Sequence, residues 1–169
     1  MRKIAIMGSP NVGKSAIFYR LTGHYATVSN YPGTTVEVTR GKGKIGAEEF
    51  EVIDTPGMYS LLPLSEDERV ARTILLKEDP AIVLHIIDAK NLERLLSLTL
   101  QLIEAGLPVI LVLNIIDESN RLGLKIDIER LEKELAVPVV ATVSITGKGI
   151  DILKGMMEAY VHRDLFRKD

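Results

Sequence analysis

The sequence contains no cysteine, which excludes disulfide bonds and thiolate metal sites and suits a cytosolic protein. A basic excess is also missing, because 21 lysines and arginines stand against 23 aspartates and glutamates. We therefore expect no nucleic-acid partner. Long hydrophobic runs are absent as well, since stretches such as residues 109–116 are far shorter than the ~20 residues that a membrane span needs. The chain also opens directly on an expected strand, without a signal peptide.

What the sequence does contain is a repeated βα pattern. Short β-branched apolar runs alternate with amphipathic segments, which is typical of a parallel sheet covered on both faces. These runs are residues 4–7, 50–53, 81–87, 109–113 and 137–143. Residues 36–45 alternate in polarity and are expected to form a hairpin with residues 50–53. The 169 residues therefore predict one doubly wound α/β domain, with a mostly parallel six-stranded sheet and about five helices.

Several helix starts are marked by residues whose side chains can cap a first turn. Ser65, followed three residues later by Glu68, is a candidate capping box. Asn91 and Asp127 are expected to cap two further helices, and a last helix is expected from Gly149.

Residues 8–15 fit the phosphate-binding pattern G-x-x-x-x-G-K-[ST]. They lie between an expected strand and an expected helix, so that backbone N–H groups and the helix N-terminus point at a triphosphate. Lys14 is expected to reach the β- and γ-phosphates, and Ser15 to bind Mg²⁺. The expected contacts are Gly8, Pro10, Asn11, Val12, Gly13, Lys14, Ser15 and Ala16. The alternative, a glycine-rich turn with a surface lysine, is disfavoured by the flanking strand and helix.

Two further segments are expected to meet Mg²⁺ and the γ-phosphate. The sequence D-T-P-G at residues 54–57 ends a strand, so that Asp54 can hold Mg²⁺ through water and the Gly57 N–H can bond the γ-phosphate. Thr34 and Thr35 are the candidates for a threonine that senses both groups. We assign Thr35, because it immediately precedes a strand. The alternatives are an ordinary strand-to-turn junction and a Pro-Gly turn with exposed threonines.

The sequence N-I-I-D at residues 114–117 selects the base. The Asp117 carboxylate can accept hydrogen bonds from the N1–H and the exocyclic amine of guanine, whereas adenine offers no such donor pair. Asn114 is expected to brace the loop and to contact the edge of the base, and the Ile115 side chain to cover a face of it. Ser144, followed by Ile145, is expected to back Asp117 and to close over the guanine. The alternative for Asn114 and Asp117 is a helix-capping turn. We therefore expect GTP and GDP rather than ATP.

Met58 limits the predicted chemistry. It stands where many GTPases carry a water-orienting glutamine, and a thioether cannot orient water by hydrogen bonding. Slow turnover is therefore expected.

The histidines are assigned no catalytic role. His24, His85 and His162 are expected to be structural or exposed, with His85 a hydrogen-bonded core residue.

The segments between these motifs resemble the prokaryotic ferrous iron transport protein B (FeoB) family. Residues 88–102 read D-A-K-N-L-E-R-L-L-S-L-T-L-Q-L and are similar to that family's D-A-x-N-L-E-R-N-L-x-L-T-L-Q-L. Residues 29–37 resemble its G-N-W-P-G-V-T-V-E, and residues 54–61 match its D-x-P-G-x-Y-S-L. The resemblance covers essentially the whole chain and implies a P-loop, Ras-like G domain of the translation-factor-related GTPase class.

In that family a cytosolic G domain precedes a helical spacer and a membrane domain that passes Fe²⁺. The resemblance implies that residues 1–169 form a single G domain, the N-terminal part of a longer transporter, at the cytoplasmic face of the membrane. It further implies that Asn11 holds a K⁺ ion beside the phosphates. The charge of this ion would replace that of an arginine finger. The residues assigned to catalysis are Lys14, Asn11, Thr35 and Gly57. The oligomeric state, a homo-oligomer included, is left open.

Three positions depart from patterns common in such GTPases. Ser29 replaces a glycine of the first switch, which alters the backbone expected to help ligate K⁺. Ile115 stands where many GTPases have lysine, as an apolar residue often does in this family, and Ile145 replaces an alanine. Modest guanine affinity is the expected consequence of the last two. Two alternatives to a transporter GTPase stay open: a nucleotide sensor with incidental turnover, and a soluble RNA- or ribosome-associated GTPase of the same branch.

Overall fold

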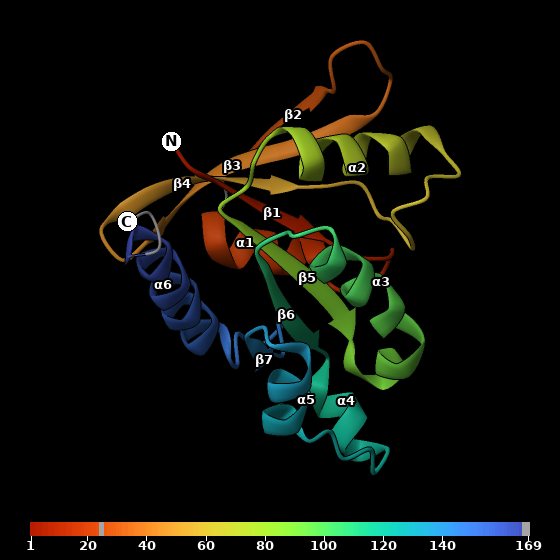
Figure 1. Cartoon of the computed structure of the whole chain (residues 1–169), viewed down its shortest axis with the longest axis vertical. Coiled ribbons are helices and arrows are strands. Elements are labelled where there is room, and N and C mark those ends of the chain that lie inside the picture. Colours follow the sequence, from red (N-terminus) through yellow and green to blue (C-terminus); the bar gives the residue numbers. More distant parts are fainter. Residues whose placement is uncertain (24–25, 167–169) are drawn as a thin grey trace.

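The structure is a computed structural model that describes residues 1–23 and 26–166. Within these ranges one seven-stranded sheet is flanked by helices on both faces (Figure 1). The strands are β1 (Lys3–Met7), β2 (Ala26–Asn30), β3 (Glu37–Ile45), β4 (Glu48–Asp54), β5 (Ile82–Asp88), β6 (Val109–Asn114) and β7 (Val139–Ala141). Their order is β2-β3-β4-β1-β5-β6-β7. The pairs from β4 to β7 are parallel, and β2 and β3 add an antiparallel edge.

Helices cover both faces of the sheet, as expected when crossover connections between parallel strands run over either face. They are α1 (Lys14–Thr22), α2 (Glu66–Lys77), the 3₁₀ helix η1 (Ala89–Asn91), α3 (Leu92–Glu104), α4 (Ile116–Arg121), α5 (Ile128–Leu135) and α6 (Ile150–Phe166). Residues of α1 and α6 pack on one face, with Ile4 and Ile6 of β1. Residues of α2 and α3 pack on the other, with Ala5 and Met7. This alternation along β1 follows from the two-residue period of a strand.

Two of the expected helix caps are confirmed and one is wrong. The Ser65 hydroxyl accepts a hydrogen bond from the Glu68 N–H at 3.1 Å, and the Asp127 carboxylate accepts one from the Arg130 N–H at 3.1 Å. Asn91 makes no side-chain capping bond, because η1 precedes α3. The Asp88 side chain caps η1 instead, accepting from the Lys90 N–H at 3.0 Å.

The predicted class, a doubly wound, mostly parallel α/β domain, is confirmed, but the predicted counts are too low. The described residues hold seven strands rather than six and six α-helices rather than about five. β2 was missed because every residue in it is exposed, which leaves no apolar alternation to detect. α4 was missed because its six residues are too few for a helical period. β7 spans only Val139–Ala141 of the apolar run at residues 137–143.

Membrane-crossing helices are absent from the part of the chain that the structure describes. None of its helices joins sufficient length to sufficient apolar character to span a bilayer.

Candidate functional site

The phosphate loop joins the carboxyl end of β1 to the N-terminus of α1, and the D-T-P-G segment lies against it (Figure 1). The Met58 N–H donates to the Gly8 carbonyl at 2.9 Å. A Cβ added at Gly57 would lie 3.1 Å from Pro10 Cδ, so the close approach of the two loops leaves little room for a side chain there. The fold therefore brings together two motifs that are separated in the sequence by residues 16–53.

The phosphate loop also touches the base-recognition motif. Its Asn11 and Gly13 have left-handed backbones, with φ of 65° and 92°. A Cβ at Gly13 would lie 2.1 Å from Asn114 Nδ2, so any side chain at this position would displace Asn114. Glycine at this step of the loop is thus required by both its backbone angle and its neighbour.

Asp54 forms the centre of the candidate Mg²⁺ site. Ser15 Oγ donates to Asp54 Oδ2 at 3.3 Å, and Lys14 Nζ lies 3.6 Å from Asp54 Oδ1. Burial raises the pKa of the Asp54 carboxyl, while the nearby Lys14 and Ser15 act to lower it. Asp54 Oδ1 is buried and has no hydrogen-bond partner. A carboxylate and a hydroxyl are the oxygen ligands that Mg²⁺ prefers, so this donor set fits the ion.

Asn114 is the hub of the base-recognition end. It is 1% exposed, and its Nδ2 donates to the Val12 carbonyl and to Ser144 Oγ, each at 3.0 Å. Its Oδ1 accepts from Thr142 Oγ1 and from the Ser144 N–H, also at 3.0 Å. These four bonds use the full capacity of the amide. Asn114 therefore braces the loops and has no donor left for the edge of a base.

Asp117 differs from Asn114 in having unused capacity. Its Oδ1 is buried without a hydrogen-bond partner, and its Oδ2 lies 3.5 Å from Arg121 Nη2 in the next turn of α4. Ile115, just before α4, has φ of 61°, a strained value for a β-branched residue. The strained residue turns the chain into α4, which begins at Ile116 and carries Asp117 in its first turn. A buried acceptor at this point fits a ligand that donates N–H groups.

The segment with the switch threonines is not brought to the phosphate loop. The Thr34 hydroxyl donates to the Tyr31 carbonyl at 2.9 Å and accepts from the Val36 N–H at 3.1 Å, which closes the turn between β2 and β3. Thr35 is exposed. Figure 1 shows this turn at the outer end of the β2–β3 hairpin, apart from the loop after β1. The free hydroxyl is that of Thr35, but ligation of Mg²⁺ by it requires this segment to move.

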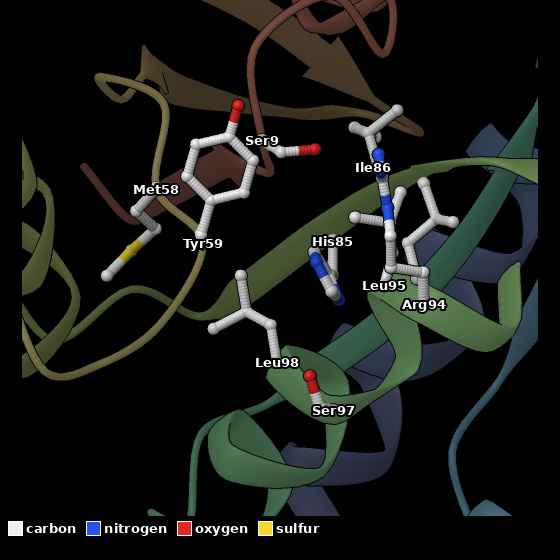
Figure 2. A pocket seen from close by; sticks show the side chains of 10 residues that line it. Ser9, Met58, Tyr59, His85, Ile86, Arg94, Leu95, Ser97 and Leu98 are labelled. Atoms are coloured by element: carbon white, nitrogen blue, oxygen red, sulfur yellow. The ribbon is translucent and has the colours of Figure 1, made fainter. Parts of the chain in front are cut away.

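Met58 faces the core rather than the phosphates. It is 0% exposed and packs with Met7 and Leu98 between the sheet and the helices α2 and α3. A cavity of about 330 Å³ lies beside it, between the D-T-P-G segment and α3 (Figure 2). Its lining includes the polar residues Ser9, Tyr59, His85, Arg94 and Ser97. Of these, only Ser9 belongs to the phosphate loop.

Two site residues escaped the sequence reasoning. Thr142 holds Asn114 through its hydroxyl. Its presence as a polar residue within the apolar run at residues 137–143 could have marked it as a site residue. Arg20 binds the carbonyls of Ser144 and Ile145, at a separation along the chain that no local pattern reveals.

The histidines agree with their predicted roles where they are described. His85 is buried, and its Nδ1 lies 2.9 Å from Thr99 Oγ1. Burial lowers the pKa of His85 to about 3, so the ring is neutral at pH 7. His162 is exposed on α6, with its Nε2 3.9 Å from a carboxylate oxygen of Glu158. His24 lies outside the described residues.

The parallel sheet, with a phosphate loop after β1, a D-x-x-G segment after β4 and an N-x-x-D segment after β6, defines a P-loop G domain. Comparison with known proteins narrows this class. The family model described as "Ferrous iron transport protein B" matches residues 2–157, and the chain belongs to this family, FeoB. This family is the one that the sequence resembled, and it is not an RNA- or ribosome-associated family.

Individual relatives agree with this membership. The Fe(2+) transport protein A/Fe(2+) transporter FeoB fusion protein of Porphyromonas gingivalis is 45% identical over 149 residues, which cover 88% of this chain and 18% of that protein. The cytosolic domain of the T. maritima FeoB iron transporter in a GDP form is 43% identical, with a TM-score of 0.90, over 95% of this chain and 63% of that one. The separate T. maritima G domain is 42% identical, with a TM-score of 0.85, over 95% and 98% of the two chains. The chain therefore spans about a fifth of the length of its curated full-length relatives, 18% in the fusion protein and 23% in the Staphylococcus aureus transporter.

Proposed function

We propose that this domain binds GTP and GDP with Mg²⁺ and hydrolyses GTP slowly, as the nucleotide-responsive part of a ferrous iron transporter. The observation that carries the proposal is a pair of buried carboxylate oxygens that have no hydrogen-bond partner among the described residues, Asp54 Oδ1, with the Lys14 ammonium 3.6 Å away, and Asp117 Oδ1. Leaving a buried acceptor unpaired costs about 1–3 kcal/mol. A ligand with a cation at one end and N–H donors at the other satisfies both atoms.

The base end favours guanine. The N1–H and the exocyclic amine of guanine can both donate to Asp117, whereas adenine would leave the carboxylate unpaired. The T. maritima relative, 43% identical to this chain, is described in a GDP form, which supports the choice of base.

The phosphate end supplies positive charge and N–H donors. Lys14 would move its ammonium group from Asp54 to the β- and γ-phosphates, and the backbone N–H groups of the phosphate loop, which Pro10 lacks, would surround them. Ser15 and Asp54 would hold Mg²⁺, directly or through water, and Thr35 would join them when its segment closes over the nucleotide. Bound Mg²⁺ neutralises charge that develops on the phosphate oxygens. The described residues contain no group of three or more His, Cys, Asp or Glu side chains suited to a metal, and phosphate and water oxygens would complete the coordination.

Slow turnover follows from what surrounds the γ-phosphate. The Met58 side chain is buried in the core, so it cannot hydrogen-bond an attacking water. The Gly57 N–H and Lys14 remain to stabilise charge in the transition state. Asn11 is exposed in the phosphate loop, where its side chain could help hold a K⁺ ion beside the phosphates. We therefore propose that K⁺ stimulates hydrolysis.

The test is GTP hydrolysis by the purified domain in KCl and in NaCl at equal ionic strength, with ATP as the control substrate. We expect faster turnover in KCl, little turnover of ATP, and loss of the KCl effect in Asn11→Ala. Equal rates in both salts would remove the K⁺ proposal and leave nucleotide binding intact. Failure to bind GDP or GTP at all would overturn the proposed function.

A second candidate is a nucleotide sensor whose GDP and GTP states set contacts with a partner while turnover is incidental. The buried Met58 favours it, because no side chain of the D-x-x-G segment is placed to drive hydrolysis. An iron-uptake assay in the full-length protein separates the two candidates by comparing Lys14→Ala with a variant that binds GTP without hydrolysing it. Uptake that survives only in the second variant supports the sensor.

The link to iron rests on the family, because the chain spans only about a fifth of its full-length relatives, 18–23%. We propose that residues 1–169 form one G domain and that, in the whole protein, it lies at the cytoplasmic face of the membrane next to a helical spacer and the Fe²⁺-passing domain.

A further inference from the structure

Arg20, in the last turn of α1, reaches across to the loop that follows β7. Its Nε donates to the Ser144 carbonyl at 3.0 Å, and its Nη2 donates to the Ile145 carbonyl at 2.6 Å. A guanidinium presents its donors in a rigid fork, and here the fork binds two successive carbonyls. One side chain of the first helix therefore holds a segment more than 120 residues away.

The same guanidinium also lies against Gly147. A Cβ added at Gly147 would be 3.0 Å from Arg20 Nη1 and 3.2 Å from its Cζ. Arg20 thus touches three residues of the loop at residues 144–147. Ile145 is 84% exposed, so it adds little apolar packing to this loop, whose own turn is closed by the Gly147 N–H donating to the Val143 carbonyl at 2.9 Å.

The loop is held from two sides. Asn114 binds both the N–H and the hydroxyl of Ser144 from the β6 side, and Arg20 binds the two carbonyls from the α1 side. Since α1 begins at Lys14, immediately after Gly13 of the phosphate loop, Arg20 ties base recognition to the helix that carries the phosphate site.

Peptide geometry gives these carbonyl contacts a consequence on the opposite side of the loop. In a trans peptide the C=O of one residue points away from the N–H of the next. Holding the Ser144 carbonyl towards α1 therefore directs the Ile145 N–H away from α1. Within residues 1–23 and 26–166 this N–H has no hydrogen-bond acceptor, so it is available to a carbonyl oxygen such as guanine O6.

We infer that Arg20 is a positioning residue for guanine recognition, which holds residues 144–147 in the conformation that closes over the base and so lengthens the residence of GDP and GTP. The inference rests on the proposed function, because it requires guanine nucleotides to be the ligands. The two Arg20 hydrogen bonds would offset the guanine contacts that lysine in place of Ile115 and alanine in place of Ile145 would supply.

The test is the dissociation rate of a fluorescent GDP analogue from wild type, Arg20→Ala and Arg20→Lys. Losing two charge-assisted hydrogen bonds that are partly exposed should speed dissociation about tenfold in Arg20→Ala. Arg20→Lys keeps the charge but not the fork, so we expect an increase of about threefold. Arg130→Ala is the matched control, because Arg130 lies on α5 and pairs only with the nearby Glu134 among described side chains. Its dissociation rate should equal that of wild type.

A second measurement separates positioning from damage to α1. The loop at residues 144–147 faces the base, so Arg20→Ala should weaken GDP binding about tenfold while leaving the affinity for inorganic pyrophosphate unchanged. Equal losses for GDP and pyrophosphate would show a general disturbance of α1 and would overturn the inference. An unchanged GDP dissociation rate in both Arg20 variants would overturn it too. A wild-type protein that binds no guanine nucleotide would overturn the proposed function, and the inference with it.

Discussion

The two ends of the candidate site are built in different ways. At the base end, Asn114 is buried and uses all its hydrogen-bonding capacity on Val12, Thr142 and Ser144. At the γ-phosphate end, Thr35 is exposed on a turn that is closed by bonds of its own residues, including the Tyr31 N–H to the Val36 carbonyl at 2.8 Å. Folding alone positions Asn114 at the base end, whereas we expect the γ-phosphate end to depend on a ligand to draw its parts together.

This difference suits the proposed function, in which one domain holds two nucleotides and distinguishes them. GDP and GTP share the same base, so a rigid base end would bind both without rearrangement. They differ in the γ-phosphate, so only a segment with alternative positions can respond to that group. The variants below test the contrast, in order of decreasing expected effect on the free energy of unfolding.

Asn114→Ala should have the largest effect. The change leaves the Val12 carbonyl, the Thr142 hydroxyl and the Ser144 N–H without their hydrogen-bond partner. We therefore expect the free energy of unfolding to fall by about 4 kcal/mol. Guanine nucleotide binding should be lost as well. Urea denaturation and GDP titration measure the two effects. The control is Asn120→Ala, an exposed asparagine of α4, which should stay close to wild type. A loss below about 1 kcal/mol in Asn114→Ala would contradict the view that folding builds the base end.

Met58→Ala should come second and separates stability from catalysis. Removing a fully buried methionine lowers the free energy of unfolding by about 3 kcal/mol. The hydrolysis rate per folded molecule should stay within a few-fold of wild type, because the thioether does not orient water. Met157→Ala provides the stability-matched control, because Met157 of α6 is equally buried but packs on the opposite face of the sheet. A large loss of rate in Met58→Ala alone would assign Met58 a catalytic role.

His85 should make the free energy of unfolding fall in acid, an effect that is separate from any titration of the site carboxylates. Its pKa is lowered to about 3 in the folded protein, whereas the unfolded ring titrates near 6.5. Between these values only the unfolded state binds the proton, so stability falls as the pH falls, by about 1.4 kcal/mol per pH unit. From pH 6 to pH 4 wild type should lose about 2.5 kcal/mol more than His85→Gln.

The sign of that effect distinguishes His85 from Asp54. Burial raises the pKa of Asp54, so protonation of this carboxyl relieves a penalty in the folded state and acts in the opposite direction. Unfolding by urea at a series of pH values, for wild type and His85→Gln in parallel, isolates the histidine. Parallel pH curves for the two proteins would show that His85 already binds a proton in the folded state.

Thr35→Ala should have the smallest effect on stability and a clear effect on turnover. An exposed hydroxyl without a partner contributes within about 0.5 kcal/mol, so unfolding should be nearly unchanged. GTP hydrolysis should fall at least about tenfold, and GDP binding should not change, if Thr35 joins Mg²⁺ and the γ-phosphate in the closed state. Thr34→Ala is the neighbouring control, since it loses turn bonds but should keep hydrolysis. The reverse pattern in the two variants would assign the ligand to Thr34.

Much of the fold was predictable where the signal is local. The apolar runs located β1, β4, β5 and β6, and the caps at Ser65 and Asp127 marked two helix starts. β2 gave no such signal, because all its residues are exposed and it forms only by pairing with β3. The cap expected at Asn91 failed because the next helix begins through a 3₁₀ turn held by Asp88.

The sequence by itself determined the class of protein, because a phosphate loop, D-x-x-G and N-x-x-D in this order each demand particular residue types at fixed short spacings. It also determined the family, through residues 88–102. Only the tertiary structure decided that Asn114 makes all its hydrogen bonds to the protein, that Asp54 and Asp117 each keep a buried oxygen without a hydrogen-bond partner among the described residues, and that Arg20 holds the Ser144 loop. The physical reason is that burial and hydrogen-bond satisfaction depend on neighbours from distant segments, whereas motif spacing depends on the local backbone alone.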